Sequence, residues 1–166
     1  MNSRYTDVAG TENRKIAGST HFAVLLWTLT CLFALRVLGQ AVQHWRPQPY
    51  LPPFSAFQGS GLKYPVLLSA QIIILGLMIR ASARVGAGTH LAGRRKVRTW
   101  GWFGSVYLAG SIVRIVVGLA LPDSPPWFRT WIPALFHLVL AGFVLVLALY
   151  SRRQLANIER TREAAA

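Results

Sequence analysis

Acidic residues are scarce in this chain of 166 residues, which has five Asp and Glu against eighteen Lys and Arg and a formal net charge of +13. Its four long apolar stretches contain no carboxylate at all. Proton relays, di-metal carboxylate sites and ordinary cation-coupled transport use carboxylates inside the membrane. Their absence from the apolar stretches therefore argues against all three classes of protein.

Cysteine is almost absent as well, because Cys31 is the single residue of its kind. A dithiol redox mechanism needs a second thiol, so the sequence excludes one within the chain. We expect Cys31 to be a small buried hydrophobe. The sequence also lacks a Gly-rich phosphate loop, a His-Glu-x-x-His pair and paired cysteines at metal-binding spacing. We therefore predict no metal site and no catalytic residue, and the sequence identifies no cofactor.

Long apolar runs are what the chain does contain, since 53% of its residues are hydrophobic and 14% are charged. A helix of about 20 apolar residues crosses a hydrocarbon core of roughly 30 Å. Four runs meet this requirement: residues 21–44, 65–84, 100–121 and 130–150. The predicted fold class is all-α, a polytopic membrane protein with a four-transmembrane-helix bundle over residues 21–151. We expect residues 1–20 to be mobile and residues 152–166 to form a basic tail, which can also prolong the fourth span as a helix.

The cations sort to one side of these spans. Thirteen of the eighteen lie before the first span, around the second link or after the fourth span, whereas three lie around the first and third links and two lie within the spans. The positive-inside rule then places both termini and residues 85–99 in the cytoplasm. We predict a multi-pass protein of the bacterial cytoplasmic (inner) membrane, N-in and C-in. Because orientation explains the basic residues, we expect no binding to nucleic acid.

Proline and aromatic residues concentrate in the two predicted outer links, 45–64 and 122–129. Amphipathic rings favour the headgroup level of a bilayer, so these residues are typical of an aromatic belt. The alternative is a short interfacial helix around Leu51 to Phe57 that covers part of the bundle.

A stripe of small residues marks the third span. Gly101, Ser105 and Ala109 follow one another at steps of four, so they share one helix face. Small residues allow two helix backbones to approach closely. We expect this stripe to pack against another helix of the same chain.

Polar residues occur at a similar predicted depth in all four spans. Counting about 1.5 Å per residue from the outer end of each span places Arg36, Gln71, Arg114 and His137 roughly 10 to 12 Å below the outer boundary. Gln40 lies one turn above Arg36 on the same helix face. An arginine near mid-depth costs several kcal/mol unless protein, water or an anion shares it. These side chains should therefore point inward.

Three interpretations of this polar layer stay open. Gln40, Gln71 and His137 can satisfy the two arginines and nearby carbonyls as clamps between helices. The arginines can instead snorkel toward the outer headgroups. In the third interpretation the layer binds an anion, because the spans offer no carboxylate to neutralise the arginines. The candidate anions are a lipid phosphate, a carboxylated amphiphile, an acid of a partner subunit, and the propionates of a haem with His137 as axial ligand.

Four spans with both ends inside, the pair Arg36-x-x-Gly39 late in the first span and a Pro-rich outer link resemble DoxX-like small bacterial inner-membrane proteins. The segment Leu51-Pro-Pro-Phe through Gly61-Leu-Lys-Tyr-Pro65 to Gln71 is similar to a stretch of uncharacterised bacterial four-span proteins. The resemblance covers roughly the first half of the chain and implies the same four-span fold. The DoxX-like pattern has an acid in the second span where this chain has Gln71, so no functional residue is carried over.

The sequence predicts a non-catalytic integral membrane accessory or scaffold subunit of a larger inner-membrane complex, with membrane lipids and partner subunits as its partners. The alternative is a binding or transfer protein for an anionic lipid, a quinone-like amphiphile or haem in the outer leaflet. An enzyme that uses His137 as an acid or base is the third interpretation. The residues expected to bind the anion or partner are Arg36, Gln40, Gln71, Arg114 and His137.

Overall fold

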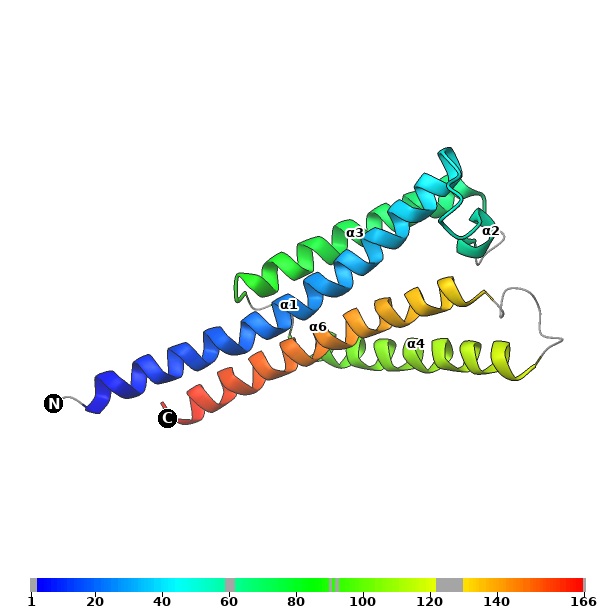
Figure 1. The fold of residues 1–166 in the computed structure, drawn as a ribbon. Coiled ribbons are helices and arrows are strands. Elements are labelled where there is room, and N and C mark those ends of the chain that lie inside the picture. The colour runs from blue at the N-terminus through cyan, green and yellow to red at the C-terminus, as the bar shows by residue number, and fades with distance from the viewer. Residues whose placement is uncertain (1–2, 59–61, 90, 92, 122–129, 166) are drawn as a thin grey trace.

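The computed structural model describes residues 3–58, 62–89, 91, 93–121 and 130–165, with the backbone alone for residues 3–19. The regular structure of these ranges is helical: α1 Ser3–Trp45, α2 Phe54–Phe57, α3 Tyr64–Gly86, α4 Arg94–Ala120 and α6 Trp131–Glu163 (Figure 1). Every helix except α2 is long and apolar enough to span a membrane. The prediction of an all-α, four-span bundle is confirmed, and the chain is a multi-pass membrane protein.

The helices extend beyond the predicted spans. α1 begins at Ser3, although its apolar part begins at Thr20, and α6 continues to Glu163. Adding residues to an existing helix is easier than nucleating one, so polar segments can continue a span. The tail thus prolongs the fourth span, as one alternative expected. The mobility of residues 1–20 stays a prediction, and the second outer link lies outside the described residues.

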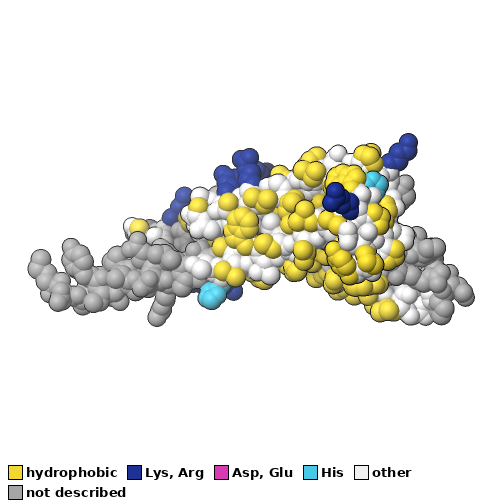
Figure 2. Space-filling model, turned by 45° about the horizontal axis from the view of Figure 1, so that its top comes forward, with side chains coloured by type: hydrophobic (Ala, Val, Ile, Leu, Met, Phe, Trp, Pro, Cys, Tyr) yellow, Lys and Arg dark blue, Asp and Glu magenta, His cyan; other side chains and the backbone are white. Residues whose placement is uncertain are grey.

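The four long helices form an open row. α1 packs on α3 and α6, and α6 packs on α4, so the order across the row is α3, α1, α6, α4. Figure 1 shows both termini at one end, here called the terminal end, while the α1–α3 and α4–α6 pairs diverge toward the other, the α2 end. α3 and α4 lie at the edges of the row, and only 17% and 11% of their most apolar windows are buried. Hydrophobic side chains accordingly cover much of the surface drawn in Figure 2.

Each interface in the row uses a narrow stripe of residues. Four of the five buried residues of α3 recur at steps of seven, namely Tyr64, Gln71, Met78 and Val85, and the fifth is Ser82. On α4 the buried residues are Val97, Gly104 and Ser111, at the same spacing. Such spacing places one stripe of each helix against its neighbour, as in coiled-coil packing. α1 pairs with α3 in antiparallel fashion, because Ser82 bonds Thr30 at 3.2 Å and Gln71 bonds Gln40 at 3.1 Å.

Two expectations about small residues are wrong. The close contact between α4 and α6 lies at Gly104, where an added Cβ would be 3.0 Å from Cγ of Leu145. A Cβ at Gly101 meets nothing within 4 Å, and the next two residues of the predicted stripe are exposed. Cys31, which was expected to be buried, is also exposed. A small side chain shows that close packing is possible, but it does not show which helix face meets a neighbour.

Candidate functional site

Helix α2 lies against α1 and α6 at the α2 end of the row. Pro53 directly precedes it with φ −59°, a value that suits the entry to a helix. Phe57 is buried, and a Cβ at Gly39 would lie 3.8 Å from the Phe57 ring. Such a distance is an ordinary van der Waals contact, so the Phe57 ring lies directly beside Gly39. A short helix, which was one alternative for residues 51–57, is present over Phe54–Phe57 alone, and it covers part of α1.

Aromatic rings gather beside α2. The ring centroids of His44 and Tyr64 are 4.1 Å apart, and those of Phe54 and Tyr64 are 5.3 Å apart. Trp45 makes an edge contact with Tyr64. His44, which shares a helix face with Arg36 and Gln40 in the sequence, belongs to this cluster and is exposed. The cluster lies where a span ends, as an aromatic belt requires.

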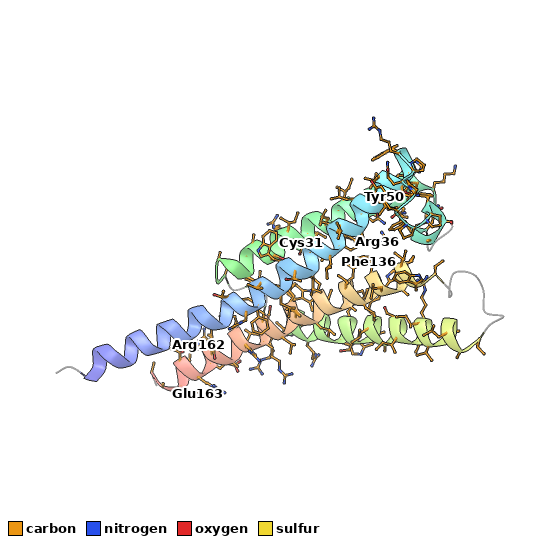
Figure 3. All side chains as sticks on the ribbon, in the orientation of Figure 1. Cys31, Arg36, Tyr50, Phe136, Arg162 and Glu163 are labelled. Atoms are coloured by element: carbon orange, nitrogen blue, oxygen red, sulfur yellow. The ribbon has the colours of Figure 1, made fainter. Side chains whose placement is uncertain are left out.

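Arg36 is held between α1, α2 and α6 (Figure 3). Its side chain is 8% exposed, and Nη2 donates a hydrogen bond to the carbonyl oxygen of Phe57 at 3.1 Å. The guanidinium lies over the Phe136 ring, 5.6 Å from its centroid. The face of an aromatic ring attracts a cation without carrying a formal charge. Arg36 therefore ties α2 to two long helices, while its buried Nε finds no hydrogen-bond partner in the described part of the chain.

Gln40 lies one turn further along α1 and meets Gln71 of α3. Nε2 of Gln71 donates to Oε1 of Gln40 at 3.1 Å, and both side chains are buried. Nε2 of Gln40 and Oε1 of Gln71 have no partner among the described residues. Two amides that share a single hydrogen bond leave a donor on one and an acceptor on the other. Each such buried group costs about 1–3 kcal/mol, so the pair favours a further polar partner.

His137 and Arg114 belong to the interface between α4 and α6. The Tyr107 hydroxyl and Nδ1 of His137 are hydrogen-bonded at 2.5 Å, and Nη2 of Arg114 donates to Oγ1 of Thr130 at 3.4 Å. Thr130 precedes His137 by seven residues, which is about 10 Å along a helix. The guanidinium of Arg114 thus lies near the beginning of α6. The common depth of Arg114 and His137 stays a prediction, and Arg114 is close enough to His137 to act on it electrostatically.

The hydrogen bonds give the five predicted residues different partners, while Arg114 and Arg36 both lie close enough to His137 to act on it electrostatically. Gln40 and Gln71 form one pair, and Arg36 lies one turn away with its own protein partners. Arg114 and His137 each bond to a different residue of the α4–α6 interface. A single anion shared by Arg36 and Arg114 stays a prediction, and the geometry gives each arginine a separate protein contact.

Several residues that contact these side chains could not be predicted from the sequence. The Phe57 carbonyl that accepts from Arg36 is a backbone group, which every residue possesses. Phe136 and Tyr107 look like ordinary apolar and aromatic residues of a span until the register between helices is known. Spacing did signal Tyr107, because it falls on one stripe with Arg114 at a step of seven. The described residues contain no cluster of three His, Cys, Asp or Glu side chains that could hold a metal ion.

The fold and the site define a multi-pass, all-α membrane protein with a buried arginine and a buried amide pair near one end of its spans. Comparison with protein-family models, with curated proteins and with solved structures finds no match to this chain. The resemblance to DoxX-like proteins stays a prediction, and function must be argued from the geometry.

Proposed function

We propose that this chain is a non-catalytic accessory or scaffold subunit of a larger assembly in the bacterial inner membrane, with both termini in the cytoplasm. The observation that carries the proposal is the open row of helices. α3 and α4 each pack mainly on one neighbour, and their other sides stay apolar and exposed. In a closed four-helix bundle the helices surround a common core. The open row therefore leaves two helix faces that the helices of a partner can complete.

One of these faces, on α4, suits a protein neighbour. Val106, Ala109, Gly110 and Val113 are exposed and recur at steps of three and four, so they share one side of the helix. A Cβ at Gly110 would meet nothing within 4 Å, so packing inside the chain does not require a glycine there. Small residues on a membrane helix allow another helix to approach closely. We infer that a membrane-spanning helix of a partner subunit packs on this side of α4.

The buried polar groups support a structural role. Arg36 joins α1 to α2, Gln71 joins α3 to α1, and Ser82 makes a second bond between the same two helices. Hydrogen bonds between separate helices stabilise a membrane bundle. These groups thus link elements of the scaffold, and this use favours assembly over catalysis.

Native mass spectrometry after mild-detergent purification tests the proposal. We expect a stoichiometric complex of this chain with a different membrane protein. Gly110→Leu should remove the partner, because the larger side chain blocks the small surface. Gly101→Leu is the matched control, since position 101 lies on the opposite side of α4 and also has open space around it. A wild-type chain that runs alone or only with copies of itself, or equal behaviour of the two variants, would contradict the proposal.

A second candidate function is the binding of an anionic or quinone-like amphiphile, or of haem, at Arg36, Gln40 and Gln71. The buried Nε of Arg36 and Nε2 of Gln40 are donors that find no acceptor within the described ranges. A phosphate, carboxylate or quinone oxygen could accept from both. Arg36→Gln should then lose a small molecule that copurifies with the wild type, whereas Arg80→Gln, at an exposed position of α3, should keep it. Mass spectrometry of an organic extract identifies an amphiphile, and an absorption spectrum identifies haem; equal retention would exclude this site.

A further inference from the structure

A groove opens between α4 and α6 toward the terminal end of the row, away from the polar residues of the candidate site. Its volume is about 730 Å³. It extends from the region of Gly104, where the two helices touch, to Arg94 at the beginning of α4 and Glu159 near the end of α6. Gly101 lines it, and the absence of a side chain there leaves the groove open.

The charged side chains that line the groove lie at one end of it, whereas apolar side chains line it throughout, including Leu155 and Ala156 beside the charges. Near the helix ends it is lined by three arginines, Arg94, Arg98 and Arg152. Toward Gly104 the lining residues are uncharged, and most of them are apolar: Ser105, Leu145, Ala148 and Leu149. A phospholipid has the same order of parts, with a phosphate at the membrane surface and acyl chains beneath it. The groove therefore matches an amphiphile better than it matches a soluble anion.

The arginines outnumber the acids in this groove. Glu159, the acid among its lining residues, forms an ion pair with Arg94. Arg98 and Arg152 are exposed, and no other carboxylate lines the groove within the described chain. Guanidinium groups bind phosphate through paired hydrogen bonds, which suits them to a phosphodiester.

We infer that this groove binds an anionic phospholipid from the leaflet on the side of the termini. Arg98 and Arg152 hold the headgroup phosphate, and an acyl chain lies along Gly101 between Leu145 and Leu149. Basic pockets between membrane helices are a known way to recognise anionic headgroups. The inference is independent of the partner subunit proposed above, since that subunit would pack on the opposite side of α4.

Native mass spectrometry of the full chain in detergent tests the inference, with phosphatidylglycerol and phosphatidylcholine as probes. We expect the chain to retain phosphatidylglycerol preferentially. The double variant Arg98→Gln/Arg152→Gln should bind it roughly thirtyfold more weakly, because each basic residue near an anionic headgroup contributes a factor of about five. The double variant Lys96→Gln/Arg153→Gln is the matched control, because it removes the same charge from residues that do not line the groove.

The control residues have other surroundings. Arg153 lies over the Phe22 ring, 5.0 Å from its centroid, and Lys96 is exposed. We therefore expect the control to lose less than about threefold in binding, in line with long-range charge alone. If both double variants weaken binding equally, the attraction comes from net charge and the proposed site is wrong.

Gly101→Leu separates a lipid from a free anion. The leucine side chain would fill the apolar part of the groove and leave the arginines in place, so phosphatidylglycerol should be lost while inorganic phosphate still binds. Gly110→Leu, on the opposite side of α4, should change neither. Phosphatidylglycerol binding that survives Gly101→Leu would assign the arginines to a free anion and overturn the lipid site. Circular dichroism on each variant checks that the helices are intact. Gly101→Leu removes no charge, so this variant tests the site even if the arginine variants fail to fold.

Discussion

Gly104 is the residue at which α4 and α6 come closest, so a single added methyl group tests that interface. A Cβ at this position would lie 3.0 Å from Cγ and Cδ2 of Leu145 and 3.2 Å from Cγ1 of Val144. These separations are shorter than the contact distance of about 3.5–4.0 Å between carbon atoms. The Leu145 Cγ lies close to its backbone and cannot move without the rest of the side chain. Overpacking of this kind costs about 1–3 kcal/mol, and we expect Gly104→Ala to show it.

Helix propensity must be separated from this packing cost, because replacing glycine by alanine in a helix gains about 1 kcal/mol. Gly110→Ala is the matched control, since it has the same change of propensity in the same helix and nothing lies within 4 Å of its Cβ. The difference between the two variants then reports the overpacking. Gly104→Ala should be less stable than Gly110→Ala by about 1–3 kcal/mol.

The assay is the free energy of unfolding of the purified chain in detergent micelles. Sodium dodecyl sulfate is titrated in, and loss of helix is followed by circular dichroism. Equal stability of the two variants would refute the placement of Gly104 at the interface. A less stable Gly110→Ala would mean that α4 presents its opposite side to α6.

Two further predictions concern topology and the α1–α3 interface. In a Cys31→Ser background on intact cells, an impermeant thiol reagent should label Tyr50→Cys and not Ala87→Cys, because the positive-inside rule places residue 87 in the cytoplasm; the reverse pattern would invert the topology. Ser82→Ala should lower the free energy of unfolding by about 0.6 kcal/mol, the average for a hydrogen bond between membrane helices, since the Ser82 hydroxyl is buried and bonded to Thr30 on α1. Ser69→Ala removes a bond within α3 and should cost less, and equal losses would contradict the interhelical role.

Much of the fold follows from local patterns in the sequence. Lipid tails offer no hydrogen bonds, so an apolar run of about 20 residues has to become a helix. The inward direction of Gln40 and Gln71 also follows, because an amide is costly in hydrocarbon and both residues are indeed buried. The open row does not follow, since the length and polarity of a span do not specify which helices become neighbours.

The contacts of the candidate site were harder to predict from the sequence, because they depend on the register between helices. Counting from the predicted outer ends gave a depth for each residue, but it could not indicate that Arg114 bonds Thr130 or that Tyr107 bonds His137. A shift in register between two helices changes no local pattern in either of them. The sequence could therefore identify polar residues that face inward but not the residues that they meet.

Arginine has two different roles in this chain, and one substitution distinguishes them. Arg36 is buried and bonded to the Phe57 carbonyl, so Arg36→Gln removes a charge-assisted hydrogen bond that joins α1 to α2. Such bonds contribute about 1.5–3 kcal/mol, and we expect the free energy of unfolding to fall by about that amount. Arg98 and Arg152 are exposed in an open groove, so the same substitution there should leave stability nearly unchanged and weaken only the binding of an anionic lipid. The test is to measure the free energy of unfolding and the binding of an anionic lipid on all three variants. If stability falls at positions 98 and 152 but not at position 36, the structural arginines lie at the terminal end and the proposed assignment is reversed.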